Sequence, residues 1–353
     1  MISMVAASVL AASVLAGCGS SGSTTTAFRL GVIGPLSGDG AAYGNAVLNG
    51  AQIAVDEINA AGGIGGYQVE LQGQDDELDA QKSVNAYNTL KDWGVQVLVG
   101  STTSACSLAV SEYTKNDGMF QITPSGSATD CVKYDNVFRV CFSDPAQGTA
   151  SAEYIGQHKL ATKVGIIYDS SDVYSSGIEQ TFVAEAPNQG IEIVSEEAFT
   201  ADNKTDFSVQ LQKAKDGGAE LVFLPVYYRE ASLILSQAST MGYKPIFFGC
   251  DGLDGILSVD NFDTSLAEGA MLLTPFSADA QDELTRKFVD SYKSKYGDTP
   301  NQFAADAYDC VYAVKQAIEA SGATSDMSAS DICDKLVASF TAKDFKFTGL
   351  TGA

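Results

Sequence analysis

Histidine is almost absent from this chain of 353 residues: His158 is the only one, and no recognisable partner motif surrounds it. Every catalytic scheme that pairs serine or cysteine with histidine would have to use this single imidazole. We expect His158 to lie at a solvated helix end instead. The Gly-x-Ser-x-Gly elbow of α/β hydrolases is also missing. Both absences argue against an enzyme.

Basic residues are scarce as well, with 21 Lys and Arg against 44 Asp and Glu and a net charge of -23. Nucleic acids and anionic headgroups are bound by basic clusters, so we expect neither as a partner. The Cys and His spacings do not match zinc sites, which excludes that metal class. The glycine-rich turn at 34–44 lacks both the phosphate-loop and the dinucleotide pattern. We therefore expect no metal and no cofactor.

The first 17 residues carry no charge, and their apolar stretch is too short to span a bilayer, which takes ~20 residues. It ends in Leu-Ala-Gly-Cys at Cys18, a pattern that resembles a bacterial lipobox. This predicts a signal peptide at 1–17, a lipidated Cys18 and a Ser/Gly/Thr-rich tether over 18–27. The protein would be exported and lipid-anchored on the outer face of the bacterial cytoplasmic membrane. The alternative is an apolar leader that ends beside an ordinary cysteine.

Six cysteines follow Cys18, and an exported protein permits disulfides among them. Six cysteines allow 15 pairings, so spacing does not decide the connectivity. Cys106 with Cys131, and Cys310 with Cys333, are candidate bridges, because each pair lies on successive segments of the predicted fold. Free buried thiols are the alternative.

Strand-like runs alternate with amphipathic segments along the rest of the chain, which predicts an α/β fold with parallel sheets. With ~330 residues after the leader, two domains are expected. The predicted strands are 28–33, 68–72, 95–99, 119–123, 137–141, 163–168, 192–195, 221–226, 245–249 and 269–274. The predicted helices are 43–61, 206–215, 230–241, 281–296 and 303–320, with a further helix opening near 105.

Ligands of such sheets bind at the carboxyl ends of the strands. Two successive turns there, 100–104 and 123–127, are rich in hydroxyl groups and free backbone N–H groups, which suit a carboxylate. In the second half, Asp251 and several tyrosines follow strands. Each feature alone also fits a helix cap. Together they predict a zwitterionic ligand held between two lobes.

The chain from residue 28 to its end resembles the branched-chain amino acid type of solute-binding protein that serves ABC importers. The resemblance rests on the order and spacing of several segments. These are 34–44, Gly62-Gly63-Ile64-Gly65-Gly66, Asp75-Asp76, 122–127, Asp206-Phe207-Ser208 and Asp306-Ala307-Tyr308-Asp309.

That resemblance implies a type I periplasmic-binding fold: two Rossmann-like lobes with parallel sheets, joined by hinge strands, with the ligand in the cleft. Lobe 1 would comprise 28–142 plus 273–353, and lobe 2 would comprise 143–272. A third crossover expected near the C-terminus is not found, which predicts a truncated C-terminus.

The resemblance also assigns roles to residues. Ser104 would hold the ligand carboxylate, Ser127 both carboxylate and ammonium, and Ser125, beside Gly126, the ammonium through its carbonyl. Asp251 replaces a glutamate that pairs with the ammonium. Aromatic side chains would cover the ligand: Tyr43, Tyr174, Tyr227 and Phe303. Thr102, Thr103 and Leu78 depart from the family pattern, which predicts a pocket more polar than one built for leucine.

The predicted function is the capture of a branched-chain or related small L-amino acid and its delivery to an ABC permease. The protein would act as a monomer, without enzymatic activity. Two alternatives remain at this point: the same clamshell could sense a ligand for a receptor, or the scaffold could be an extracellular hydrolase.

Overall fold

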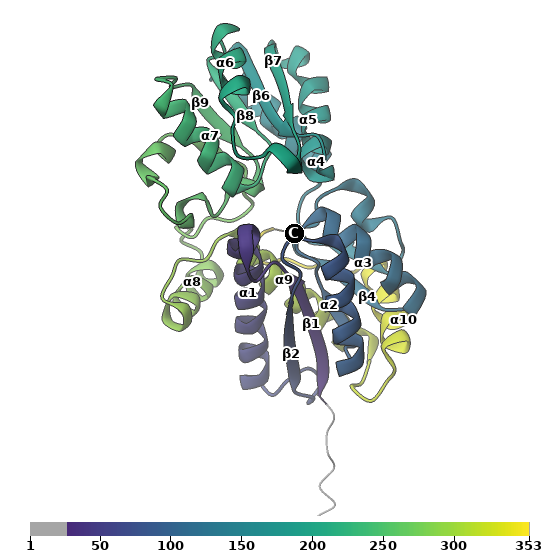
Figure 1. Ribbon diagram of the computed structural model, residues 1–353. Coiled ribbons are helices and arrows are strands. Elements are labelled where there is room, and N and C mark those ends of the chain that lie inside the picture. Colours follow the sequence, from purple (N-terminus) through teal and green to yellow (C-terminus); the bar gives the residue numbers. More distant parts are fainter. Residues whose placement is uncertain (1–26, 353) are drawn as a thin grey trace, which may run out of the picture.

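The computed structural model describes residues 27–352, whose strands form two sheets of five strands each. All paired strands run parallel. Their orders are β2-β1-β3-β4-β5 and β10-β9-β8-β6-β7. Figure 1 shows each sheet in a lobe of its own. The strands are β1 Phe28–Gly34, β2 Val69–Asp75, β3 Val97–Val99, β4 Phe120–Thr123, β5 Val137–Arg139, β6 Lys163–Asp169, β7 Glu192–Phe199, β8 Leu221–Leu224, β9 Ile246–Gly249 and β10 Met271–Leu272.

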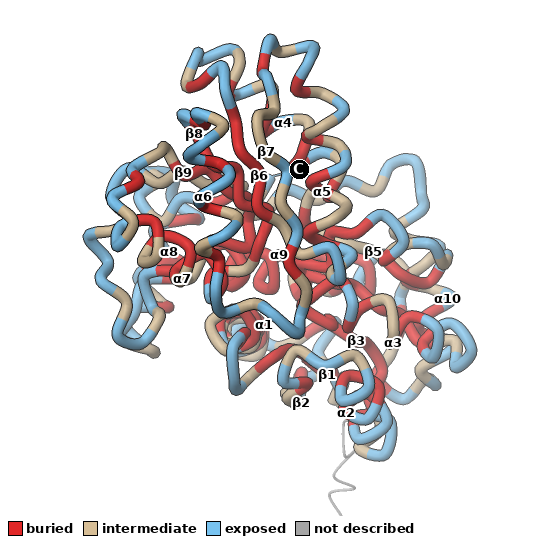
Figure 2. Tube along the Cα trace, turned by 45° about the horizontal axis from the view of Figure 1, so that its top comes forward, coloured by how far each residue is buried: buried red, intermediate tan, exposed pale blue. Residues whose placement is uncertain are grey.

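Helices cover both faces of each sheet, which is why the central strands are apolar on both sides. In the first lobe, α1 and α9 pack on one face, where Leu30 and Val32 point, and α2 and α3 pack on the face of Ile33. In the second lobe, α6 and α7 cover one face and α4 and α5 the other. Figure 2 shows the buried stretches concentrated along the strands and the inner sides of the helices. The α-helices are α1 Ala41–Ala60, α2 Ala80–Trp93, α3 Ser104–Asp117, α4 Asp144–Gln157, α5 Val173–Glu185, α6 Ser208–Asp216, α7 Tyr228–Thr240, α8 Glu283–Tyr296, α9 Gln302–Ser321 and α10 Ala329–Phe340.

All ten predicted strands are present, with ends that differ by a few residues, and the α/β fold of two parallel-sheet lobes is confirmed. The five delimited helices and the helix predicted to open near 105 are also present. Helices α2, α4, α5 and α10 were not delimited in advance. Helix α4 is rich in Gly, Ala and Ser, so its buried face shows little of the apolar period that marks a helix.

The chain passes from the first sheet to the second between β5 and α4, and it returns to the first lobe after β10. Helix α9 then packs along α1, and α10 packs on α9 and β4. The predicted lobe boundaries, 142/143 and 272/273, fall within these connections and stay predictions.

Candidate functional site

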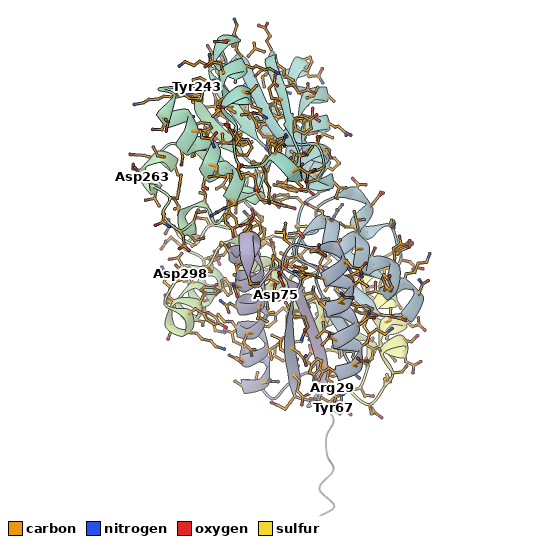
Figure 3. All side chains as sticks on the ribbon, in the orientation of Figure 1. Arg29, Tyr67, Asp75, Tyr243, Asp263 and Asp298 are labelled. Atoms are coloured by element: carbon orange, nitrogen blue, oxygen red, sulfur yellow. The ribbon has the colours of Figure 1, made fainter. Side chains whose placement is uncertain are left out.

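A pocket lies where the carboxyl ends of the two sheets face each other. Figure 3 shows the direction of the strands: Arg29 and Tyr67 lie at the far end of the first lobe, and Asp75 lies toward the second lobe. Residues that follow the strands of both sheets therefore line the pocket. The pocket is lined by Tyr43, Thr102, Thr103, Ser104, Ser125, Tyr174, Tyr227, Asp251, Gly252 and Phe303.

The glycine-rich turn after β1 brings α1 to this pocket. Asp75 holds the turn, because its carboxylate accepts hydrogen bonds from Leu36 N (2.8 Å) and the Ser37 hydroxyl (2.6 Å). A Cβ at Gly44 would overlap the carbonyl oxygen of Pro35, so only glycine permits this close return of the chain. The turn thereby places Tyr43 in the lining of the pocket.

The wall from the first lobe is the start of α3 together with the turn after β4. Ser104 is the first residue of α3, and its hydroxyl oxygen accepts a hydrogen bond from Ala128 N at 3.1 Å. The first N–H groups of α3 lack helical partners, and a helix N-terminus favours negative charge. This wall therefore suits a carboxylate.

Thr102 lines the pocket, and its hydroxyl proton is already used within the protein. Its hydroxyl donates to the carbonyl oxygen of Ile33 at 3.2 Å, beneath the pocket and beside Gly34. Since that hydroxyl donates its proton to Ile33, toward the ligand it can act only as a hydrogen-bond acceptor. The prediction of a pocket more polar than one built for leucine stays a prediction.

The wall from the second lobe carries a buried carboxylate. Asp251 follows β9 and is 3% exposed; its Oδ1 accepts from the Tyr174 hydroxyl at 2.7 Å. The Gln147 side-chain oxygen accepts from Asp251 N at 3.1 Å. Burial raises the pKa of Asp251 to about 6, although the hydrogen bond from the Tyr174 hydroxyl opposes the rise. A buried carboxylate with so few donors is suited to a cation.

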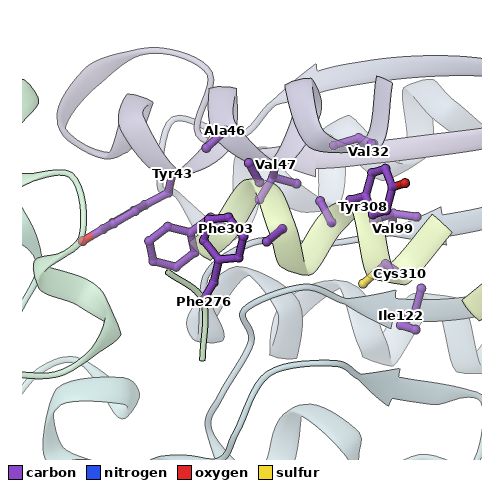
Figure 4. Close-up of a cluster of buried hydrophobic side chains, with 14 of the residues drawn as sticks. Val32, Tyr43, Ala46, Val47, Val99, Ile122, Phe276, Phe303, Tyr308 and Cys310 are labelled. Carbon is purple, nitrogen blue, oxygen red and sulfur yellow. The ribbon is translucent and has the colours of Figure 1, made fainter. Parts of the chain in front are cut away.

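Aromatic rings close the pocket from three sides. The Tyr43 ring lies 4.7 Å from that of Phe303 and 5.6 Å from that of Tyr227, and Tyr227 stacks on Tyr174 at 5.1 Å. Figure 4 shows Tyr43 and Phe303 side by side, projecting from α1 and α9. These rings shield the interior from water, which strengthens any charge pairing inside.

The two lobes touch around the pocket. The Tyr43 hydroxyl donates to the carbonyl oxygen of Gly252 and accepts from Tyr228 N at 3.1 Å. On the other side, the backbone N–H and the side-chain amide of Gln302 donate to Asp254 Oδ2 at 3.1 and 3.2 Å. The described structure is thus a closed arrangement of the lobes.

Two predicted site residues do not line the pocket. Gly126 N donates to the Thr123 hydroxyl at 2.7 Å, and Ser127 is fully buried behind the pocket wall. The structure adds Gly252, which directly follows Asp251 in the same turn and could have been included on that ground. It also adds Gln147, which no motif singled out, because its contact with Asp251 spans more than a hundred residues.

The cysteine prediction is corrected: all six described cysteines are free and buried. Cys131 Sγ faces the carbonyl oxygen of Ser104 at 3.6 Å, whereas Cys106 faces Asp76 and Ser83. Cys310 lies within α9 and Cys333 within α10, and both are buried. Each thiol of the proposed pairs therefore faces its own surroundings and not the other thiol.

His158 is exposed at the end of α4, as predicted. Among residues 27–352, no group of His, Cys, Asp and Glu is arranged to hold a metal ion. No helix in the same range is long and apolar enough to cross a membrane. Cys18 and the predicted signal peptide lie outside the described residues.

Two parallel-sheet lobes with a pocket between them are the architecture of the type I periplasmic-binding fold, and sequence comparison agrees. Residues 27–349 match the family model described as "Periplasmic binding protein", so the chain belongs to the periplasmic binding protein family. The family and its neighbours in this comparison are substrate-binding proteins, and the resemblance stated above is confirmed.

Several named relatives bind branched-chain amino acids. The chain is 32% identical over 308 residues to "Leu/Ile/Val-binding protein homolog 3" of Brucella melitensis, covering 85% of this chain and 81% of that one. It is 28% identical to the "Leucine-, isoleucine-, valine-, threonine-, and alanine-binding protein" of Pseudomonas aeruginosa, covering 89% of this chain and 84% of that one.

Among solved structures, the chain is similar to the branched-chain amino acid transporter substrate-binding protein LivJ from Streptococcus pneumoniae, in complex with isoleucine. The TM-score is 0.80 and the identity 31%, covering 93% of this chain and 91% of that one. The chain is also similar to a leucine-binding protein from Thermotoga maritima, with a TM-score of 0.81 and 27% identity. The match covers 92% of this chain and 90% of that one.

Proposed function

We propose that this protein captures a branched-chain or related small L-amino acid outside the cell and delivers it to an ABC importer. The names of its relatives support this class of ligand. One observation in this chain carries the proposal: the two walls of the pocket have opposite electrostatic character. Ser104 and the start of α3 suit a carboxylate, while Asp251 suits an ammonium group. The ligand is bound and released without chemical change.

A few strong hydrogen bonds are enough for this task. Hydrogen bonds to charged groups contribute ~1.5–3 kcal/mol each, and a micromolar dissociation constant needs ~8 kcal/mol. The carboxylate wall and the ammonium wall together supply several such bonds. Burial of an aliphatic side chain against Tyr43, Phe303 and Thr102 adds about 1.5–3 kcal/mol.

Delivery would follow from closure of the lobes. In this proposal lobe 1 is 28–142 plus 273–353 and lobe 2 is 143–272, and the ligand favours the closed arrangement by touching both. The bonds from Tyr43 to Gly252 and from Gln302 to Asp254 form only when the lobes meet. The permease would recognise the surface that closure creates, and the binding protein would act as a monomer.

L-leucine, L-isoleucine and L-valine are expected to raise the melting temperature of the purified protein, whereas sugars and nucleotides leave it unchanged. A ligand that binds only the folded state adds about 2.7 kcal/mol at a hundredfold excess over its dissociation constant. A thermal-shift screen against all amino acids and a sugar panel checks this. D-leucine is the matched control, since it carries the same chemical groups with the opposite configuration at Cα. Stabilisation by a sugar and by no amino acid would overturn the assignment.

Cys18→Ala is expected to abolish lipid attachment and to release the protein from the membrane fraction. The reason is that the thiol of Cys18 would be the acylated group in the predicted lipobox. Metabolic labelling with a fatty-acid probe, followed by membrane fractionation, checks this. Cys106→Ala, at a buried thiol far along the chain, is the control and should keep its label. Equal labelling of wild type and Cys18→Ala would contradict the lipobox.

A further inference from the structure

Both lobes of this protein are strongly acidic. Residues 143–272 contain 19 Asp and Glu against 7 Lys and Arg, and residues 28–142 with 273–353 contain 25 against 14. Closure therefore brings together two bodies of like charge, and their mutual repulsion disfavours the closed arrangement. Opposite charges that pair across the junction of the lobes offset this repulsion.

Within residues 27–352, only two ion pairs join the lobes, and both end on the same carboxylate. Asp39 lies in the glycine-rich turn of the first lobe; its Oδ2 is 3.6 Å from Lys204 Nζ and its Oδ1 is 3.8 Å from Arg229 Nε. Lys204 follows the 3-10 helix Ala201–Asn203, and Arg229 lies in the first turn of α7. Both cations therefore belong to the second lobe. Figure 1 shows the start of α1, which follows Asp39, at the level where the lobes meet.

Lys204 is held in position by its own lobe. Its ammonium group lies 3.3 Å from the carboxylate of Glu230, whose side chain is only 9% exposed. The turn before Lys204 is closed by a hydrogen bond from Thr200 N to the side-chain oxygen of Asn203 at 2.8 Å. Because these contacts lie within the second lobe, they do not depend on closure. The cation is thus in place before Asp39 reaches it, which lowers the entropy cost of pairing.

The carboxylate is presented by an equally ordered turn. Gly38 has a φ of 74°, a left-handed conformation that glycine adopts without strain, and it sets the direction of the chain at Asp39. Just beyond the turn, Ala42 N donates to the Tyr228 hydroxyl of the second lobe at 3.2 Å. Asp39 and Arg229 therefore meet beside a point where the lobes already touch. Neither residue lines the ligand pocket.

We propose that Asp39 is an electrostatic latch: it pairs with Lys204 and Arg229 when the lobes close, and opening breaks both pairs. The inference rests on the proposed function, because the latch acts on the retention of an amino acid in the closed cleft. Ion pairs as exposed as these each change an equilibrium by about 1.4- to 5-fold, and salt screens them. The latch therefore raises affinity by a modest, salt-dependent factor without touching the ligand.

Asp39→Asn is expected to weaken L-leucine binding about fivefold in 10 mM NaCl, where the Debye length is about 30 Å, and less than twofold in 1 M NaCl, where it is about 3 Å. Calorimetric titration of variant and wild type at both concentrations gives the ratio of their dissociation constants. The ratio isolates the latch, because salt also screens the general repulsion between the lobes in both proteins. Asp92→Asn removes the same charge from an exposed position on α2 of the same lobe and should bind like the wild type.

A double-mutant cycle with Arg229→Gln separates a direct pair from a general effect of charge. Arg229→Gln alone should weaken binding about twofold to threefold in 10 mM NaCl, and it should have no effect in the Asp39→Asn protein, where its partner is already gone. Arg229→Gln also carries the salt comparison if Asp39→Asn does not fold. Wild-type affinity in Asp39→Asn at 10 mM NaCl, or an equal effect of Arg229→Gln in both backgrounds, overturns the inference and leaves the proposed function standing. Failure of every L-amino acid to bind overturns both.

Discussion

Asp251→Asn is expected to weaken L-leucine binding more than a hundredfold while leaving the empty protein folded. Removing one partner of a buried ion pair costs ~3–5 kcal/mol, because the other charge stays buried without compensation. Asp251 is well placed for such a pair, since it is 3% exposed and lies on the pocket wall. Asparagine keeps an oxygen for the Tyr174 hydroxyl, so the wall itself should hold its shape.

The stability of the empty variant gives an independent check. The pKa of Asp251 is raised to about 6, so ionising this side chain lowers the stability of the folded state as the pH rises from its ordinary pKa through about 6. Asparagine removes that cost, and the melting temperature of the empty variant at pH 7 should be unchanged or higher. Asp260→Asn, an exposed carboxylate of the same segment, is the matched control and should bind like the wild type. Unchanged affinity in Asp251→Asn, measured by calorimetry, would remove Asp251 from the site.

Gly50→Ala is expected to destabilise the first lobe by about 3 kcal/mol and to weaken ligand binding as well. Helices α1 and α9 cross at Gly50, where a Cβ would overlap the carbonyl oxygen of Ala304. The helices must move apart to admit a methyl group, and overpacking of this kind costs ~1–3 kcal/mol or more. Because Tyr43 on α1 and Phe303 on α9 both line the pocket, the same displacement loosens the aromatic cover.

Urea unfolding followed by circular dichroism, together with leucine titration, measures both effects of Gly50→Ala. Ala60→Ser adds one atom at an exposed position of the same helix and should change stability by no more than about 0.5 kcal/mol. A Gly50→Ala protein with the stability and affinity of the wild type would show that α1 and α9 adjust to the methyl group without cost.

The regular elements were largely predictable because their signals are local. Strand β1 is buried from Leu30 to Gly34, as expected for a central parallel strand, and α1 repeats apolar residues at helical spacing. Helix α4 was not delimited because its buried face, which packs closely on α5, carries only two apolar side chains, Ala152 and Ile155. The candidate disulfides paired cysteines on successive predicted segments, and they are not formed. That two segments follow each other in the sequence does not fix the distance between their sulfur atoms.

The position of a residue after a strand nominated eight of the ten pocket-lining residues, from Tyr43 to Asp251, and the family resemblance added Phe303 on α9. That success has a physical reason: parallel strands end at one edge, so residues after different strands converge there. The roles of these residues as ligand contacts stay predictions.

By itself, the sequence determined the α/β class, the parallel sheets and the set of turns that meet at the site. The spacing of apolar residues and the residues that end a strand can both be recognised within a single short segment. Only the tertiary structure decided how those groups are paired. It assigned the Thr102 hydroxyl to Ile33, left the carboxylate of Asp144 without a donor, and set Gln147 against Asp251 across more than a hundred residues. Hydrogen-bond partners and burial depend on distances in space, and those distances exist only once the two lobes have packed.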